Sequence, residues 1–333
     1  MPALSMTRPS VVHDYLLMNS LVVWKNGFPL VSVIIPTYNR WPMVGEAVES
    51  VLKQSFRDFE LIVIDDGSTD DTTKELQKYG SDIRLVSQLR SGAAAARNSG
   101  VAMAQGPYLT FLDSDDLWRP KKLEIQTRFM VQHPEIEICQ TEEVWVRKGI
   151  KVNPKARHRK PSGDIFRDSL DLCLVSPSAV MLTKELFEKV GRFDESLPVC
   201  EDYDLWLRIA VDHEVPLIPS ALTVKRGGHA DQLSHSIWGM DRYRVRALQK
   251  LLRSNLSGER RAWTLAALKC KVSVLSHGAR KRGKEPEALG YEAILSEFIQ
   301  ETVNVRGADS RLCQEQGATC SDLGAVVELG PGR

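Results

Sequence analysis

Two aspartates separated by one serine follow directly on an apolar stretch of the sequence. Asp113 and Asp115 come after the run YLTFL, which predicts a buried strand. Carboxylates at the mouth of a buried strand lose solvation unless a cation compensates them, and these two point to the same side of an extended chain. Such oxygen ligands suit Mg²⁺ or Mn²⁺, which share their shell with substrate phosphates. The alternative is that residues 113–116 cap a following helix.

Three further polar clusters could serve the same site. Residues 36–40 and 65–66 each follow an apolar run, and they offer an aromatic face and carboxylate acceptors suited to a nucleobase. Each of these two also fits an ordinary turn, because turns use the same residue types. Glu201 and Asp202 begin the helical segment EDYDLWLRIA, where they could cap the helix or supply a general base that accepts a hydroxyl proton.

The elements that must position these clusters alternate between strands and helices. Strands are predicted over Leu30–Pro36, Phe59–Ile64, Ile83–Val86 and Tyr108–Leu112, and helices over 43–55, Thr72–Tyr79 and Ser91–Ala104. This alternation predicts an α/β fold with a mostly parallel twisted sheet flanked by helices. Ligands of such sheets bind beyond the carboxyl ends of the strands, so the acidic clusters are expected to meet in one crevice.

The second half of the sequence has a less regular pattern. The basic segment 147–160 carries seven Lys or Arg and no acid, which fits a solvated loop or a lip that contacts phosphates. Helices are predicted over Thr183–Val190, Glu201–Ala210, Gly239–Arg253 and 258–282. The basic helical stretch from 240 to 300 could shape an acceptor cleft, dock on a membrane surface or pair protomers.

Composition sets the broad class of protein. The 333 residues are 43% hydrophobic and 26% charged, which is ordinary for a globular chain, and a net charge of +1 leaves no global attraction for nucleic acid. No window approaches the roughly 18 apolar residues of a membrane span. The start shows no signal-peptide pattern, and the six cysteines form no CxxC pair. A cytoplasmic protein is expected, with peripheral contact at the inner face of the membrane left open.

Four segments taken in order resemble family 2 glycosyltransferases of the GT-A fold. They are VSVIIPTYNR, DFELIVIDDGSTDDT, GAAAARNSGVAMAQGPYLTFLDSDDLWRPKKLE and GRFDESLPVCEDYDLWLRIA, and the match runs from about residue 30 to 235. The resemblance implies transfer of a sugar from a nucleotide diphosphate donor, most often uridine-linked, to an acceptor hydroxyl with inversion at the anomeric carbon.

The expected domain layout follows from this match. An N-terminal extension over 1–29 precedes a GT-A domain over 30–238, whose nucleotide-binding part covers about 30–118 and whose acceptor-side part covers about 119–238. A helical extension over 239–303 and a flexible tail over 304–333 complete the layout.

The resemblance also implies roles for residues around the nucleoside. Pro36, Thr37 and Tyr38 match the loop that lines the nucleoside, with Tyr38 placed to stack on the base. Asp66 matches the carboxylate that hydrogen-bonds the uracil edge, and Asp65 lies beside it.

A second group of residues would hold the diphosphate and a divalent Mn²⁺ or Mg²⁺. Asp113, Ser114 and Asp115 match the family's DxD motif, whose two aspartates would meet the metal. Arg97 matches an arginine near the diphosphate, and His229 matches a histidine at the metal or phosphate.

The paired acids of the helical segment complete the implied site. Asp202 matches the catalytic base, with Glu201 as its neighbour, so no covalent intermediate is required. The expected acceptor is a sugar, a lipid-linked sugar or a small molecule in polysaccharide, glycolipid or glycoconjugate synthesis, and a homo-oligomer stays open. The alternative function is a catalytically silent glycosyltransferase-like module that binds a partner or glycan.

Other enzyme classes fit the sequence less well. A haloacid-type phosphatase has Thr two positions beyond the second Asp of its motif, where Leu117 stands here. A nicotinamide enzyme is disfavoured because no GxGxxG follows the first strand, and no P-loop motif is present.

Overall fold

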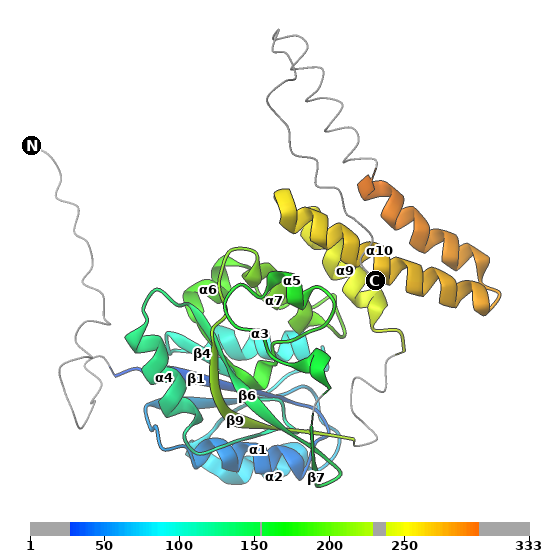
Figure 1. Cartoon of the computed structure of the whole chain (residues 1–333). Helices are drawn as coiled ribbons and strands as arrows, with labels where there is room; N and C mark the ends of the chain where they lie inside the picture. The colour runs from blue at the N-terminus through cyan, green and yellow to red at the C-terminus, as the bar shows by residue number, and fades with distance from the viewer. Residues whose placement is uncertain (1–26, 154, 229–237, 300–333) are drawn as a thin grey trace, which may run out of the picture. The chain divides into compact units, whose positions relative to one another are not determined.

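The computed structural model describes residues 27–153, 155–228 and 238–299 (Figure 1). Its first half is a parallel sheet in the order β3-β2-β1-β4. The strands are β1 (Val31–Thr37), β2 (Phe59–Asp65), β3 (Arg84–Ser87) and β4 (Tyr108–Phe111), and the helices are α1 (Met43–Leu52), α2 (Thr72–Leu76) and α3 (Ala93–Met103). The strands and helices predicted for this half of the chain are confirmed.

Helices cover both faces of this parallel sheet. Figure 1 shows α1 and α2 on one side of the sheet and α3 on the other. Every residue of β1 is therefore buried, which explains why its sequence is a continuous apolar run rather than an alternating one. The α/β prediction with parallel strands is confirmed in this half.

Helix α3 packs unusually close to the sheet. A Cβ atom built on Gly100 would lie 2.4 Å from Cγ2 of Ile34 in β1, so only glycine fits at that position. The alanine-rich sequence of α3 has the same physical reason, since small side chains let a helix approach a strand. This close approach places the polar residues of α3 beside the ends of β1 and β4.

The second half of the chain extends the sheet with mixed strand directions. β8 (Val180–Thr183) runs antiparallel to β4 and to β6 (Ile138–Arg147), whereas β9 (Leu217–Gly227) runs parallel to β6. The short β5 (Leu117–Trp118) pairs antiparallel with β9. Helices α4 (Lys122–Gln132), α5 (Phe166–Ser169), α6 (Lys184–Lys189) and α7 (Glu201–Ala210) complete this part.

Two local expectations differ from the structure. Residues 113–116 do not cap a helix, because β5 follows them and α4 begins only at Lys122. The basic segment 147–160 is not a plain loop: it contains the end of β6, the strand β7 (Ile150–Val152) and a 3₁₀ turn over Ala156–His158. At its end, Lys160 is buried and lies 3.3 Å from Glu143.

The contacts divide the chain into two units, residues 1–264 and 265–333. The first unit contains α9 (Asp241–Leu252), which packs against α7. The long helix α10 (Gly258–Lys281) crosses the division, and a further helix covers 285–299 in the second unit. Within the second unit, Arg280 pairs with Glu285 and Glu292.

The helices predicted over Gly239–Arg253 and 258–282 are present as α9 and α10. Most of the expected N-terminal extension and all of the expected tail lie outside the described residues. No helix in the described ranges combines the length and the apolar character that crossing a bilayer requires.

Candidate functional site

The carboxyl ends of β1 and β2 lie side by side at one edge of the sheet. Thr37 is the register partner of Asp65, and the backbone N–H of Asp66 donates to the carbonyl oxygen of Thr37 across 2.8 Å. Pro36, Thr37, Asp65 and Asp66 are all buried, and Tyr38 is half-buried. The structure therefore brings together the five residues predicted to line the nucleoside.

The two neighbouring aspartates of this edge hold different loops. Asp65 is 1% exposed, and its carboxylate accepts hydrogen bonds from the Ser68 N–H at 3.1 Å and from the Thr73 hydroxyl. Its contacts fix the turn that leads into α2. The predicted contact of Asp65 with a ligand finds no support in this inward placement.

Asp66 holds the segment that follows β3. Its Oδ1 accepts from the Gln88 side-chain amide and the Ser91 N–H, and its Oδ2 accepts from the Gly92 N–H, each across 2.8 Å. Gly92 has a φ of 93°, a left-handed conformation that favours glycine at this sharp entry to α3. Asp66 therefore shapes the wall of the site that carries residues 88–92.

This wall contributes a cation that sequence reasoning missed. Arg90 donates to the Tyr38 hydroxyl across 2.6 Å, and its guanidinium carbon lies 3.8 Å from the centre of the Tyr38 ring. One face of the ring is thus covered by Arg90, so a base can stack only on the other face. The sequence did contain one indication of Arg90, because this residue comes just after a predicted strand and directly before Ser91 and Gly92.

Arg97 of α3 connects two of the predicted clusters. Its guanidinium donates to Asp113 Oδ1 across 2.7 Å and to Glu201 Oε1 across 2.6 Å, and its side chain is 6% exposed. Burial lowers the pKa of Arg97, but the charges of Asp113 and Glu201 outweigh burial and raise it, so the guanidinium stays charged. Burial raises the pKa of Glu201 and the charge of Arg97 lowers it, and the net effect is a raised pKa.

The aspartates after β4 form a tight turn with one buried member. The Asp116 N–H donates to the Asp113 carbonyl across 3.0 Å, and Asp116 accepts from the Ser178 hydroxyl at 2.7 Å and the Arg226 N–H at 2.9 Å. Burial raises the pKa of Asp116 well above its usual value, Lys225 opposes this, and the two neighbouring aspartates add to it. Ser178 was not predicted as a site residue, whereas Asp116 belongs to the acidic cluster expected in the crevice.

The rest of this turn remains accessible. Asp113, Ser114 and Asp115 are half-buried, and their placement leaves carboxylate oxygens at the surface of the site. No group of three or more His, Cys, Asp or Glu side chains is arranged for a metal within the described residues. Two carboxylates do fit a divalent cation that takes its remaining oxygen ligands from phosphates and water. The predicted ligand His229 lies outside the described residues.

A half-buried lysine lies near several of the acidic groups. Lys225 of β9 donates to the Ser176 hydroxyl across 3.1 Å. Burial lowers its pKa, but Glu143 raises it most, followed by Asp116, Asp113 and Asp202, and the net effect is a raised pKa. Lys225 therefore balances the negative charge of both the DxD turn and the first turn of α7. Lys225 lies four residues before His229, the metal or phosphate ligand that the resemblance implies.

Asp202 lies in the first turn of α7, behind a residue with left-handed backbone. Cys200 precedes the helix with a φ of 65° and makes no side-chain cap. Glu201 is buried whereas Asp202 is half-exposed, so Asp202 is the more accessible carboxylate of the two. The thiol of Cys173 donates to Asp202 Oδ2 at 3.5 Å, and burial followed by the charge of Asp202 raises the pKa of that thiol.

Comparisons with known proteins agree with this architecture. A family model described as glycosyl transferase family 2 matches residues 32–191. A Rickettsia felis protein named an uncharacterized glycosyltransferase is 37% identical over 204 residues, which is 59% of this chain and 33% of that protein. The chain thus spans about a third of the length of that relative.

A second relative and a solved structure extend the comparison. The Escherichia coli protein named UDP-Glc:alpha-D-GlcNAc-diphosphoundecaprenol beta-1,3-glucosyltransferase WfgD is 33% identical over 191 residues, or 57% of this chain and 73% of that protein. The structure of S. aureus TarS 1–349 in complex with UDP-GlcNAc has a TM-score of 0.57 at 19% identity, covering 81% of this chain and 92% of that one. The structural likeness confirms the expected fold class, and the sequence matches show that the chain belongs to glycosyl transferase family 2.

Proposed function

We propose that this protein transfers a sugar from a nucleotide diphosphate sugar to an acceptor hydroxyl by a single inverting displacement. The observation that carries the proposal is the double ion pair of Arg97, which ties Asp113 of the DxD turn to Glu201 of α7. The pair places a phosphate-side carboxylate next to the helical turn that bears Asp202. The sugar donor and the carboxylate that accepts the proton would therefore meet at one site.

A uridine nucleotide is the proposed donor base. Tyr38 offers the one ring face that Arg90 leaves uncovered, and Asp66 stands beside it at the same sheet edge. The names of two similar proteins support uridine, since one contains UDP-Glc and the other describes a complex with UDP-GlcNAc. Arg90 would add a positive charge close to the nucleoside, which suits a ligand that carries two phosphates.

A divalent cation is proposed to sit between Asp115, Asp113 and the donor diphosphate. When bound, it would supply charge stabilisation to the nucleoside diphosphate as that group leaves. The chain's own part is to hold the two carboxylates in place. Arg97 fixes Asp113 from behind, and Ser178 accepts a hydrogen bond from the Asp113 N–H across 3.1 Å. We assign Arg97 this positioning role rather than direct contact with the diphosphate, because two carboxylates already engage it.

Asp202 is proposed as the general base. It would take the proton from the acceptor hydroxyl while the oxygen attacks the anomeric carbon from the face opposite the leaving group, which inverts that carbon. The Cys173 thiol stays protonated and can keep donating to Asp202 Oδ2, which holds the carboxylate in one orientation. The charge of Asp202 is among those that raise the pKa of Lys225, so this cation stays charged near the proposed base.

The proposed acceptor is a sugar or lipid-linked sugar in polysaccharide or glycoconjugate synthesis. The name of the E. coli relative, which describes transfer to a GlcNAc-diphosphoundecaprenol, supports this class.

The test combines donor binding with chemistry. Thermal unfolding is measured with UDP, GDP, dTDP, CMP, ADP and NAD, each with and without Mn²⁺, because a ligand at 100 times its Kd stabilises by about 2.7 kcal/mol. A rise in Tm with one diphosphate that requires Mn²⁺ supports the donor site. No rise with any of them would favour the catalytically silent module instead.

Chemistry is tested with the isosteric Asp202→Asn variant and the donor selected by unfolding. The variant is expected to keep the Mn²⁺-dependent rise in Tm and to lose sugar transfer and donor hydrolysis. Near-normal turnover by Asp202→Asn would remove Asp202 as the base while leaving the donor site intact.

A further inference from the structure

The charged residues along the outer face of helix α9 are all basic. Arg242, Arg246, Lys250 and Arg253 recur at intervals of three or four residues, which places them on one side of the helix. The buried residues of the helix lie on the other side, and they are Val245, Ala247, Leu248, Leu251 and Leu252. The single acidic residue, Asp241, pairs with Arg244 at 2.9 Å. The whole chain has a net charge of only +1, so this concentration of cations is local.

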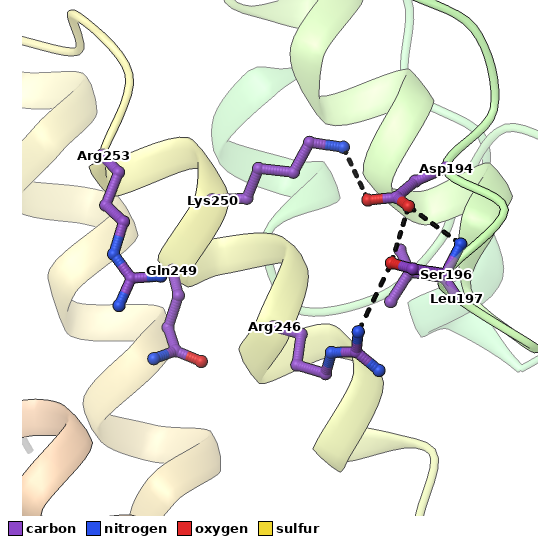
Figure 2. Close-up of a pocket in the computed structure, with 7 residues that line it drawn as sticks. All are labelled: Asp194, Ser196, Leu197, Arg246, Gln249, Lys250 and Arg253. Carbon is purple, nitrogen blue, oxygen red and sulfur yellow. Dashed lines mark hydrogen bonds and ion pairs between the residues drawn. The ribbon is translucent and has the colours of Figure 1, made fainter.

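A cavity of about 230 Å³ lies between this face and the loop before α7 (Figure 2). Its lining includes Arg246, Gln249, Lys250 and Arg253 of α9, together with Asp194 and Ser196 of the loop. Three of the lining side chains are cationic and one is anionic. The size and charge of the cavity suit a phosphate group.

The one carboxylate of the cavity is already engaged. Figure 2 shows Lys250 reaching Asp194, at 2.9 Å, while Lys250 also contacts the buried Asp204 of α7 at 3.0 Å. Burial opposes ionisation of Asp194, but hydrogen bonds from Ser196 and then Lys250 hold its pKa at about 2. Asp194 therefore serves to fix Lys250, whereas Arg246 and Arg253 are exposed, and Arg246 donates to the Ser196 hydroxyl across 3.3 Å.

A tryptophan stands at the beginning of the same face. Trp238 is 55% exposed, just before α9. Arg242 donates to the Trp238 carbonyl across 2.6 Å, and its guanidinium lies 4.8 Å from the centre of the indole ring. Tryptophan side chains favour the headgroup region of a membrane, where basic residues meet anionic lipids. A nucleic-acid strand would instead call for a long basic groove, which a cavity for one phosphate does not provide.

We propose that the outer face of α9 docks on an anionic lipid bilayer, with one lipid phosphate group in the cavity beside Arg246 and Arg253. Trp238 enters the headgroup region next to that phosphate. This surface is separate from the carboxylate site and does not depend on the proposed transfer reaction. The basic residues of this surface bind the chain to an anionic membrane.

The test is co-flotation of the full chain with vesicles. Wild-type protein is expected to float with phosphatidylcholine vesicles that contain one third phosphatidylglycerol, and not with pure phosphatidylcholine. The double variant Arg246→Gln/Arg253→Gln should bind about 30-fold more weakly, because each basic residue near an anionic surface contributes about 1 kcal/mol. Lys250 is left in place because it pairs with buried Asp204.

A matched control removes the same charge elsewhere. Arg128→Gln/Lys189→Gln neutralises two exposed cations on α4 and α6 and should bind as wild type does. Trp238→Ala leaves the charge unchanged and should still weaken vesicle binding. Thermal unfolding of each variant shows that it is folded.

Several results would overturn the proposal. Unchanged flotation of the α9 double variant, or an equal loss in the control variant, would remove the face as the docking surface. A rise in Tm with inorganic phosphate that needs Arg246 and Arg253, without any flotation, would assign the cavity to a free phosphate. Equal affinity for single-stranded DNA and for vesicles would mean general binding of polyanions.

Discussion

The guanidinium of Arg97 donates to Asp113 Oδ1 across 2.7 Å, which joins helix α3 to the end of strand β4. The other side of the same guanidinium holds Glu201 at 2.6 Å. One side chain thus determines the spacing between the DxD turn and α7, and the proposed metal ligands and base depend on it together.

We expect Arg97→Met to lower the free energy of unfolding by about 3–5 kcal/mol, because it leaves two carboxylates without their buried partner. Urea denaturation measures this loss. The control Arg192→Ala removes an exposed pair with Glu188 and should change stability by less than about 1 kcal/mol. Adding Glu201→Gln to Arg97→Met should recover part of the loss. A variant as stable as wild type would show that the double ion pair does not hold the site.

Asp115→Asn should weaken UDP binding only when Mn²⁺ is present. The expected loss is at least about tenfold, since a hydrogen bond or ligand contact from a charged group is worth about 1.5–3 kcal/mol. Isothermal titration with and without the metal measures it, and Asp82→Asn, at an exposed aspartate on the far end of the 3₁₀ turn before β3, is the control. Equal weakening without metal would point to a distorted turn instead of a lost ligand.

Arg90→Ala should reduce nucleotide affinity about two- to fivefold and leave the Tm of the free protein nearly unchanged. The reason is that Arg90 holds the Tyr38 ring in the orientation in which it would stack on the base, and a cation–π contact at an exposed site is worth about 0.5–1 kcal/mol. The same titration of Arg128→Ala, an exposed arginine on α4, provides the comparison. Affinity that stays at the wild-type value would exclude Arg90 from the donor site.

The lowered pKa of Lys122 predicts that the free energy of unfolding rises with pH. Burial lowers the pKa of this side chain from 10.5 to about 7 in the folded protein. Between these values the unfolded chain binds the proton more often than the folded chain does, so raising the pH favours folding. From pH 7 to 8.5 the free energy of unfolding should increase by up to about 2 kcal/mol. Lys122→Met should flatten that rise, and an identical pH profile in both proteins would refute the assignment.

The parallel half of the fold could be predicted because each element is buried in a regular way. The continuous apolar run of β1 and the helical spacing of α1 both report burial directly, and the structure reproduces them within a few residues. The two-residue strand β5 has no such periodicity. The alternative that residues 113–116 cap a helix therefore stayed open from the sequence, whereas they form a turn between two strands.

The residues missed at the site depend on long-range pairing. Lys225 reaches the acidic cluster because β9 pairs with β6 and brings this lysine to Ser176. Arg90 reaches Tyr38 because Asp66 holds the loop that carries Arg90. Each relation leaves only a weak local signal in the sequence, because the contact itself joins residues far apart in the chain. The residues that were predicted instead sit at strand or helix ends, where chain order alone brings them close.

The contact between Gly100 and Ile34 makes the site sensitive to a residue that touches no substrate. Gly100 lies one helical turn from Arg97, and its bare backbone sets how near α3 comes to β1. An added methyl group there would push the helix outward and carry the guanidinium away from its partners. The lack of a side chain at Gly100 thus sets the distance between α3 and β1, and with it the position of Arg97.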